Sequence, residues 1–337
     1  MNNILVTFKP KLGETQFFNA SNKAQADVRL IALKSGFVER LVEYNNRGRF
    51  ISLVTRIIGF AQLLYSLPKG SKLLIQYPFL PLWIHWCFSG IMRSKFYCIA
   101  VVHDLNSVRE HGKLNRQEQG ALSTFKKLIV HTPSMKELLT SRLTSDIEYG
   151  VLEIFPYLAK PNLDQKALKT SSDTVVFAGN LHKSFFLKDL SERNLDYTVF
   201  LYGASRPFSD SLAIVYKGSF VPDEVEGVDG TWGLVWDGES CDECSGHYGE
   251  YLEIIASHKI SLYIACGKPV IVWSKSAMAS FVSKHGIGIL VDRLDHIGRA
   301  IRKADYNQML KSVECVSRDY ISGNYLSSII KQICNND

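Results

Sequence analysis

The 337-residue sequence lacks any long uninterrupted apolar run. Its most apolar region, residues 73–92, is broken by a glutamine, a histidine and two prolines, whereas a membrane-spanning helix needs about 20 largely apolar residues in a row. Residues 1–8 have neither the basic start nor the following apolar stretch of a secretory signal. The seven cysteines are odd in number and scattered, which does not fit a disulfide framework. These absences predict a cytoplasmic protein without a transmembrane helix.

The sequence also lacks the short motifs of several enzyme classes. It has no Gly-x-x-x-x-Gly-Lys-Ser/Thr, no Gly-x-Gly-x-x-Gly and no Gly-x-Ser-x-Gly, which disfavours P-loop kinases, dehydrogenases and serine hydrolases. Cys241, Cys244 and His247 resemble half of a zinc site, but no second Cys/His pair lies at a suitable spacing. We therefore expect no structural zinc.

Positive charge is concentrated in the first half of the chain. Residues 1–160 hold 21 Lys and Arg and 11 Asp and Glu, although the net charge of the whole chain is only +6. The basic residues are dispersed and no nucleic-acid-binding motif accompanies them, so we expect no nucleic acid partner. An anionic membrane surface or a phosphate-bearing acceptor fits better, and a solvated basic surface is the alternative interpretation.

Short apolar runs alternate with helical stretches in both halves of the chain. The runs expected to form strands are residues 4–8, 72–77, 97–103 and 128–131 in the first half, and 174–178, 197–202, 215–218, 232–236, 269–272 and 288–291 in the second. This alternation predicts parallel sheets with right-handed crossovers. A polar stretch at residues 159–173 interrupts the pattern and predicts a linker, after which the alternation restarts. We therefore expect an α/β protein with two doubly wound, Rossmann-like domains facing a cleft. Residues 309–333 are expected to form one or two amphipathic helices.

The most informative segment is residues 257–273. Ser257 is a suitable N-cap for an apolar-periodic helix, and Gly267 and Pro269 mark its end before a buried strand. Lys259 then lies in the first helical turn, where a cation opposes the helix macrodipole. An anion bound at the helix N-terminus would reverse that effect, and Lys259 would close on it. A surface lysine tolerated at small cost is the alternative.

Two further segments place small and polar residues after buried strands. Residues 232–236 are followed by Asp237 and Gly238, and then by a Gly-rich stretch that contains Tyr248. Gly179 and Asn180 follow the first strand of the second domain and precede two candidate phosphate ligands. These candidates are His182 and Lys183, and their spacing does not show which of the two binds the phosphate. Ordinary strand-to-helix turns explain both segments nearly as well.

In the first half, His103 and Asp104 end a predicted strand, where a carboxylate can remove a proton from an acceptor hydroxyl. Arg109 could orient Asp104 or bind the acceptor; helix capping by Asp104 is the alternative. Thr15 and Gln16 lie in a polar loop, residues 13–23, that follows the first strand. This loop is either a lid that binds the acceptor sugar or a passive surface loop.

Trp83 and Trp86 stand among apolar neighbours in residues 80–88. Such aromatic residues stack on sugar rings or lie at a membrane interface. The more ordinary interpretation is a helix packed on the sheet.

The segments 232–240, 246–251 and 258–270 together resemble the bacterial β-1,6-galactofuranosyltransferases of O-antigen assembly. They also resemble the glucosyltransferases that extend glycans on streptococcal serine-rich adhesins. The resemblance is colinear over nearly the whole chain. It implies a GT-B architecture without an essential metal or other cofactor. It further implies an acceptor domain at residues 1–160, a donor domain at 171–318, and a C-terminal helix, about 319–337, that packs back on the first domain.

The resemblance also implies roles for individual residues. Lys259 and the helix start, including Ser257 and His258, would hold the diphosphate of the donor. Asn180 and Lys183 would line the donor side, and Tyr263 would support the loop. The chain differs from the family pattern at Ala256-Ser257, where relatives have Asn-Pro.

These observations predict a glycosyltransferase that moves a hexose, galactofuranose in the first instance, from a UDP-sugar to a glycan hydroxyl with inversion. Asp104 or His103 would be the base. The alternatives are a UDP-glucose-dependent enzyme of protein glycosylation and a non-catalytic sugar-nucleotide or glycan-binding protein. The acceptor would be a lipid-linked or protein-linked glycan. Peripheral contact with the inner membrane and homo-oligomerisation are both left open.

Overall fold

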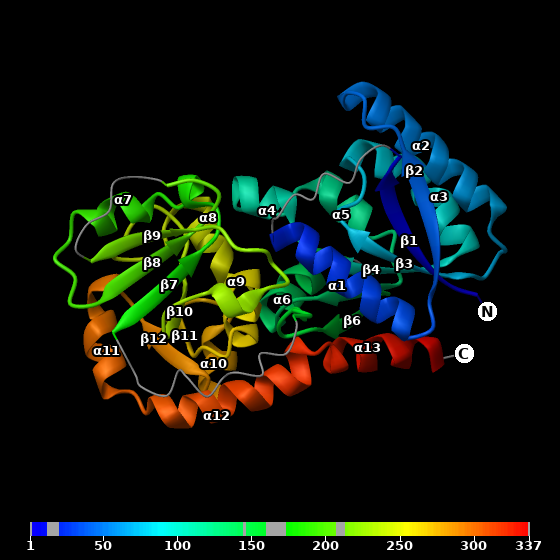
Figure 1. The fold of residues 1–337 in the computed structure, drawn as a ribbon. Coiled ribbons are helices and arrows are strands. Elements are labelled where there is room, and N and C mark those ends of the chain that lie inside the picture. The colour runs from blue at the N-terminus through cyan, green and yellow to red at the C-terminus, as the bar shows by residue number, and fades with distance from the viewer. Residues whose placement is uncertain (1, 12–19, 144–145, 160–172, 207–212, 336–337) are drawn as a thin grey trace. The chain divides into compact units, whose positions relative to one another are not determined.

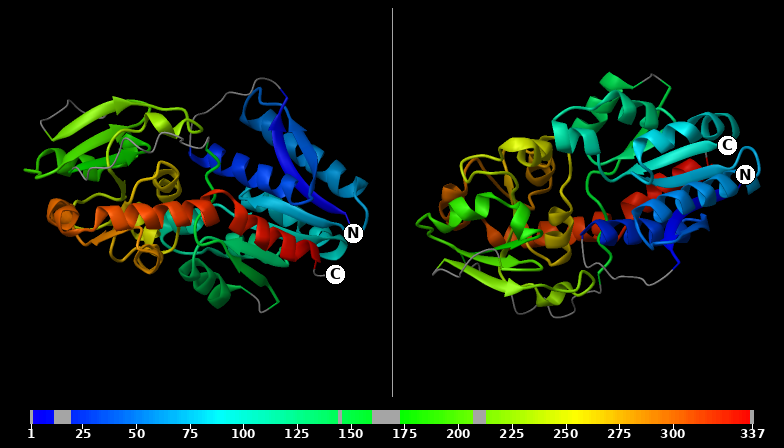
Figure 2. Two further views of the ribbon diagram at one scale, coloured as in Figure 1. Left: turned by 60° about the horizontal axis from the view of Figure 1, so that its bottom comes forward. Right: turned by 90° about the horizontal axis from the view of Figure 1, so that it is seen from above.

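The computed structural model describes residues 2–11, 20–143, 146–159, 173–206 and 213–335. The chain forms two compact units (Figure 1). The N-terminal unit comprises Met1–Phe17, Val28–Leu152 and Ser327–Asp337, and the C-terminal unit comprises Phe18–Asp27 and Glu153–Leu326. Each unit contains one six-stranded sheet in which every strand pair is parallel, with helices on both faces (Figure 2).

The sheet of the N-terminal unit has the strand order β2-β1-β3-β4-β5-β6. Its strands are β1 (Asn3–Pro10), β2 (Val38–Tyr44), β3 (Lys72–Tyr77), β4 (Tyr97–Val102), β5 (Lys127–Val130) and β6 (Glu148–Val151). Its helices are α2 (Arg49–Ser66), α3 (Leu82–Lys95), α4 (Asn106–His111), α5 (Arg116–Leu122) and α6 (Pro133–Arg142). Helices α1 (Ala20–Lys34) and α13 (Asn324–Asn335) each have residues in both units.

The side of the sheet that each helix covers follows from the handedness of the crossovers. The connections β2→β3 and β3→β4 cross the sheet in the same direction, so right-handed crossovers place α2 and α3 on one face. The connection β1→β2 runs the other way and places α1 on the opposite face. There the Ser35 hydroxyl, just after α1, lies 3.0 Å from that of Ser327 in α13. Both faces of β3 and β4 are therefore covered, and both strands are almost entirely buried.

The sheet of the C-terminal unit has the strand order β12-β11-β10-β7-β8-β9. Its strands are β7 (Thr174–Ala178), β8 (Thr198–Tyr202), β9 (Ile214–Gly218), β10 (Trp232–Val235), β11 (Val270–Trp273) and β12 (Gly288–Val291). Its helices are α7 (Phe186–Ser191), α8 (Gly246–Glu250), α9 (His258–Ala265), α10 (Ala279–His285), α11 (Ile297–Lys303) and α12 (Tyr306–Val316). Short 3₁₀ helices are η2 (Leu181–Lys183), η3 (Val225–Gly227), η4 (Tyr251–Glu253) and η5 (Leu294–His296), and η6 (Ser317–Ile321) is a π-helix.

Two apolar cores lie on the two faces of this second sheet. One includes residues of α9, α10 and α12, such as Ile260, Phe281 and Val313. The other includes residues of α7 and α11, such as Phe186 and Ile297. The prediction of two doubly wound α/β sheets is confirmed.

Two further predictions concern the linker and the absence of a membrane-spanning helix. The predicted linker, residues 159–173, falls mostly outside the described residues. Within the described part of the chain, none of the helices combines the length and apolar character that crossing a membrane requires.

Candidate active site

The second sheet has a topological switch point between β7 and β10. These strands pair with each other, but the chain leaves β7 toward β8 on one side and leaves β10 toward β11 on the other. Ligands of open α/β sheets bind beyond the carboxyl ends of the strands at such a point. Gly179 and Asn180 follow β7 here, and Asp237 and Gly238 follow β10. Segments almost 60 residues apart in sequence therefore contribute to one edge.

Lys259 lies at this switch point. It occupies the first turn of α9, and its Nζ donates to Asp237 Oδ2 at 3.1 Å. The ammonium lies 5.2 Å from the centre of the Phe177 ring, and a β-carbon added to Gly179 would be 3.2 Å from Lys259 Cε. The side chain is 17% exposed, so it is not the freely solvated lysine of the alternative interpretation. The lysine bridges the ends of β7 and β10.

Tyr263 fixes α9 against the same two strands. Its hydroxyl accepts a hydrogen bond from the Ala178 N–H at 2.9 Å, at the last residue of β7. Its ring packs so closely over Gly233 of β10 that a β-carbon at this glycine would overlap it. Tyr263 is fully buried, and burial raises the pKa of its phenol, so the hydroxyl stays neutral. It contributes to the geometry of the site and not to its charge.

The loop after β10 is folded tightly around two glycines. Gly238 has φ +105°, a conformation that residues with a β-carbon rarely adopt, and a β-carbon there would overlap the backbone of Ser245. Its carbonyl accepts a hydrogen bond from the Phe186 N–H at 3.2 Å. Gly249 likewise leaves no room for a β-carbon beside Cys244. Tyr248, in α8 of this loop, is 41% exposed.

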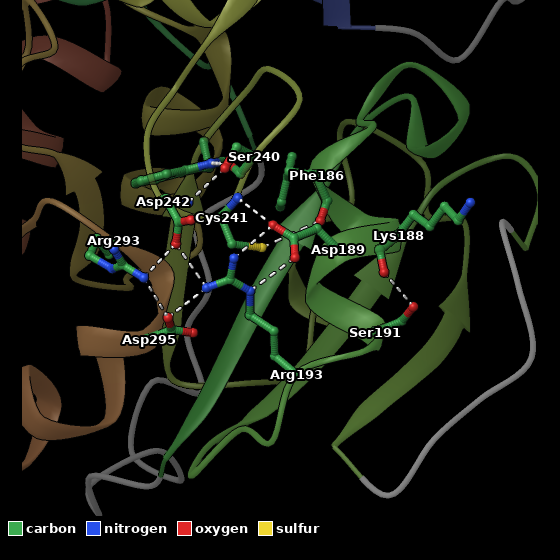
Figure 3. A network of polar contacts seen from close by, with 11 residues as sticks. Phe186, Lys188, Asp189, Ser191, Arg193, Ser240, Cys241, Asp242, Arg293 and Asp295 are labelled. Atoms are coloured by element: carbon green, nitrogen blue, oxygen red, sulfur yellow. Dashed lines mark hydrogen bonds and ion pairs between the residues drawn. The ribbon is translucent and has the colours of Figure 1, made fainter.

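An ion-pair network ties this loop to α7 and to η5 (Figure 3). Arg193 donates from Nε and Nη2 to the two oxygens of Asp189, at 3.0 and 2.9 Å. Its Nη1 also donates to Asp242 at 2.9 Å and to Asp295 at 2.6 Å. The Cys241 N–H donates to Asp189 at 3.0 Å. The guanidinium holds the pKa values of Asp189 and Asp242 below their usual range, so these carboxylates remain ionised near neutral pH.

The other predicted phosphate ligands have different surroundings. His182 and Lys183 lie in η2, directly after Asn180, and both side chains are exposed. His182 Nε2 lies 2.6 Å from the Ser205 hydroxyl. Ser257 occupies the N-cap of α9 without a side-chain capping bond, and the His258 ring lies 5.2 Å from that of Tyr157.

A pocket of about 560 Å³ opens at the same edge of the sheet. It is lined by the end of β8, by β9 and by the segment between β9 and β10, including Tyr202, Ser219 and Asp229. The Gly179 N–H donates to the Tyr202 carbonyl at 3.0 Å, so this pocket adjoins the end of β7. Sequence reasoning missed it, because the only signal was a loop of mixed composition after β9.

The predicted acceptor residues lie beyond the end of β4 in the N-terminal unit. Asp104 Oδ2 accepts a hydrogen bond from Arg109 Nη1 at 2.5 Å. His103 Nε2 lies 2.7 Å from Gln76 Oε1 at the end of β3. The neighbouring His131 is buried, which lowers its pKa to about 4 and keeps it neutral. Asp104 and His103 are partly exposed, as a base that meets a substrate must be.

The remaining sequence features are the polar loop after the first strand and the Cys241–Cys244 pair. Thr15 and Gln16 lie outside the described residues. In the described ranges, no group of three His, Cys, Asp or Glu side chains is arranged to hold a metal ion. Cys241 and Cys244 are buried, which raises the pKa of both thiols, and Cys241 Sγ donates to the Phe186 carbonyl at 3.5 Å.

Comparison with known proteins agrees with this architecture. Models of the glucosyltransferase 3-like family match residues 10–154 (N-terminal domain) and residues 175–333 (C-terminal domain). The beta-1,6-galactofuranosyltransferase WbbI of Escherichia coli (strain K12) is 27% identical over 293 residues, which cover 83% of this chain and 85% of that protein.

Solved structures show the same fold at much lower identity. Sucrose-phosphate synthase from Thermosynechococcus elongatus has a TM-score of 0.65 at 12% identity, over 99% of this chain and 98% of that chain. HepE of Anabaena, in complex with UDP and glucose, has a TM-score of 0.59 at 11% identity, over 99% of both chains. The two family models together span most of the sequence in the expected order. The chain therefore belongs to the glucosyltransferase 3-like family and is a glycosyltransferase of the GT-B fold.

Proposed function

We propose that this enzyme transfers a hexose from a UDP-sugar to a hydroxyl of a glycan acceptor, and that the hexose is galactofuranose. The observation that carries the proposal is Lys259, which lies in the first turn of α9 at the switch point of the second sheet. A cation there meets an anion held by the α9 N-terminus. The 27% sequence identity to a galactofuranosyltransferase, over 83% of this chain, supports the choice of sugar.

The proposed reaction is a single displacement with inversion. The acceptor oxygen bonds to the anomeric carbon as the bond from that carbon to the UDP oxygen breaks, and the acceptor proton passes to Asp104. Arg109 holds the Asp104 carboxylate by their ion pair. Lys259 and the α9 N-terminus stabilise the charge that develops on the leaving diphosphate, and Lys183 adds a second cation. We propose that this stabilisation is supplied by the protein without a metal ion.

Asp237 has a definite part in this proposal. Its carboxylate holds the Lys259 ammonium at 3.1 Å, between the ends of β7 and β10. A diphosphate bound at the α9 N-terminus then adds a second anion beside an ammonium that is already oriented. Orientation before binding lowers the cost of ordering a long side chain when the donor arrives.

A second candidate is transfer of glucose from UDP-glucose to a protein-linked glycan. It is favoured by the family models, which describe a glucosyltransferase. The two candidates share the UDP handle that Lys259 would bind, and they differ in the sugar and in the acceptor. For galactofuranose transfer we propose a lipid-linked acceptor in surface polysaccharide assembly, at the cytoplasmic face of the membrane.

A donor screen tests the proposal directly. Release of UDP is measured with UDP-galactofuranose and with UDP-glucose, each beside a lipid-linked glycan acceptor and a protein-linked one. Faster release with UDP-galactofuranose and the lipid-linked acceptor supports the first candidate, and the opposite pairing supports the second. If no UDP-sugar is consumed with any acceptor, the non-catalytic alternative replaces both.

Two substitutions test the residues. Lys259→Ala should lower the rate of transfer by about 10²-fold or more, because one donor aimed at developing charge contributes about that much in other enzymes. Lys311→Ala, an exposed lysine of α12, is the matched control and should leave the rate unchanged. Asp104→Asn should abolish transfer while donor binding persists. Unchanged turnover in Lys259→Ala would exclude the diphosphate role, and full activity in Asp104→Asn would assign the base elsewhere.

A further inference from the structure

The charge of the N-terminal unit is distributed unevenly along its sequence. Between Glu43 and Asp104 the chain has no acidic residue, while it has seven lysines and arginines. This segment includes α2, β3, α3 and β4. Of its basic residues, only Lys72 is buried in the sheet. The outer surface of α2 and α3 is therefore positively charged.

The same segment exposes apolar side chains that a soluble surface normally covers. Trp83 and Trp86 in α3 are 61% and 73% exposed, and Phe50 and Tyr65 in α2 are 78% and 86% exposed. The helix α3 does pack on the sheet, as the more ordinary interpretation has it, but Ile84 and His85 occupy its inward positions and both tryptophans are left exposed. The exposed large apolar residues of α2 and α3 are Phe50, Ile51, Ile58, Tyr65, Trp83, Trp86 and Ile91.

These side chains gather on one surface. The two helices lie side by side on one face of the first sheet (Figure 1), and the inward rings of Phe60 and Phe88 meet edge to face at 5.0 Å between them. In α2, Ile51, Ile58 and Tyr65 recur every seven residues, which places them along one side of the helix. We call the outer surface of α2 and α3, with its exposed apolar and basic side chains, the α2–α3 face.

We propose that the α2–α3 face docks on an anionic lipid membrane. Exposed tryptophan, tyrosine and aliphatic side chains insert at the boundary between headgroups and acyl chains, and arginine and lysine attract anionic headgroups. Arg49 and Arg93 are exposed cations of the two helices, and the exposed Arg47 and Lys69 flank α2 before its start and after its end. Both contributions are needed, because a single weak anchor gives only marginal membrane binding.

A second copy of the chain is the competing occupant. In a two-fold symmetric dimer the same face meets itself, so each arginine needs an acidic partner from that face. The segment from Tyr44 to His103 supplies none. A face that carries cations and no acidic residue repels its own copy, whereas it is complementary to phosphatidylglycerol.

The docking proposal rests on the proposed function, because a lipid-linked acceptor is the reason for the enzyme to bind a membrane. Binding to vesicles does not involve sugar transfer, so the two proposals can fail separately. The full-length protein is floated with vesicles of phosphatidylcholine and with vesicles of equal parts phosphatidylcholine and phosphatidylglycerol. We expect flotation only with the anionic vesicles, and weaker flotation as salt is added.

Tryptophan fluorescence gives a second readout that is specific for this face. The other three tryptophans, Trp232, Trp236 and Trp273, are buried in the C-terminal unit. A blue shift of the emission on adding anionic vesicles therefore reports on Trp83 and Trp86. The shift should be absent from the W83S/W86S variant, which changes only exposed positions and should fold normally.

Matched variants separate the apolar from the electrostatic contribution. W83S/W86S should lose most flotation, and L290S, which removes an exposed leucine of the C-terminal unit, should not. R47Q/R49Q/R93Q should weaken binding by roughly fivefold for each arginine. R318Q, an exposed arginine of the C-terminal unit, is its control.

The results decide between the occupants. Loss of flotation in both α2–α3 variants, with both controls unchanged, supports the proposal. Failure of the wild-type protein to float with anionic vesicles overturns it. Equal flotation of the variants and the controls also overturns it. A wild-type oligomer that W83S/W86S dissociates, measured by light scattering and without vesicle binding, assigns the face to a second copy instead.

Discussion

The Tyr263→Phe substitution removes one oxygen atom and keeps the ring that packs on Gly233. The Ala178 N–H then loses the acceptor that it reaches over 2.9 Å in a fully buried part of the core. A buried donor left without a partner costs about 1–3 kcal/mol. For a unit of this size each kcal/mol lowers the midpoint of thermal unfolding by roughly 2–4 °C, so we expect a decrease of roughly 2–12 °C.

The same substitution should also weaken binding of the donor. The lost hydrogen bond anchors the end of β7, and the next residue, Gly179, lies against Lys259. A loosened β7 end should raise the KM for the UDP-sugar severalfold, with a smaller effect on kcat. Thermal unfolding is followed by circular dichroism, and the KM is measured from UDP release.

Tyr197→Phe is the matched control. Tyr197 is also buried, but its hydroxyl donates to the Leu294 carbonyl of η5 at 3.1 Å and not to a residue at the end of β7 or β10. Its loss should lower the unfolding temperature and leave the KM unchanged. The reasoning is refuted if Tyr263→Phe unfolds at the wild-type temperature. It is also refuted if Tyr197→Phe raises the KM equally.

Two further predictions concern charged groups of the C-terminal unit. Arg193→Ala should cost up to about 1 kcal/mol and make stability more dependent on salt, because Asp189 loses its partner and only Arg293 remains beside Asp242 and Asp295. Arg193→Lys should not restore the stability, since lysine cannot bind both oxygens of Asp189. Full rescue by lysine, measured by urea unfolding, would contradict this. Burial raises the pKa of Asp27 to about 6, beside Lys23 at 2.7 Å. A carboxyl group whose pKa is raised by folding contributes stability that the protein loses as the pH rises. The free energy of unfolding of the wild type, relative to that of Asp27→Asn, should therefore be about 1 kcal/mol larger at about pH 5 than at about pH 7. Equal pH dependence in the two proteins would argue against this.

The sequence predicted the second sheet better than the first. All six strands of the C-terminal unit were expected within about one residue of their bounds, because they are short apolar runs with polar flanks. In the first sheet, β2 and β6 were missed. Both are edge strands, and β2 carries exposed charges such as Arg40 and Glu43, so neither has the continuous apolar pattern of a central strand.

The residues of the candidate site could be predicted from the sequence, but the contacts between them could not. The position of Lys259 in the first turn of a helix followed from Ser257 and Gly267, and α9 agrees with it. Its pairing with Asp237 could not be predicted, because it depends on strand order: β10 lies next to β7 only after the chain has crossed back over the sheet. The pocket after β9 depends on the same crossing.

The division of α1 and α13 between the two units has a consequence for how the chain can fold during synthesis. Residues 327 onward belong to the N-terminal unit, where Ser327 meets Ser35, although the whole C-terminal unit is translated before them. Domains usually fold in the order in which they leave the ribosome. Here the unit that is begun first can be completed only last, and the C-terminal unit itself needs residues 18–27 from near the beginning. A chain cut after Leu152 would therefore yield two incomplete pieces, and the two units must be produced together.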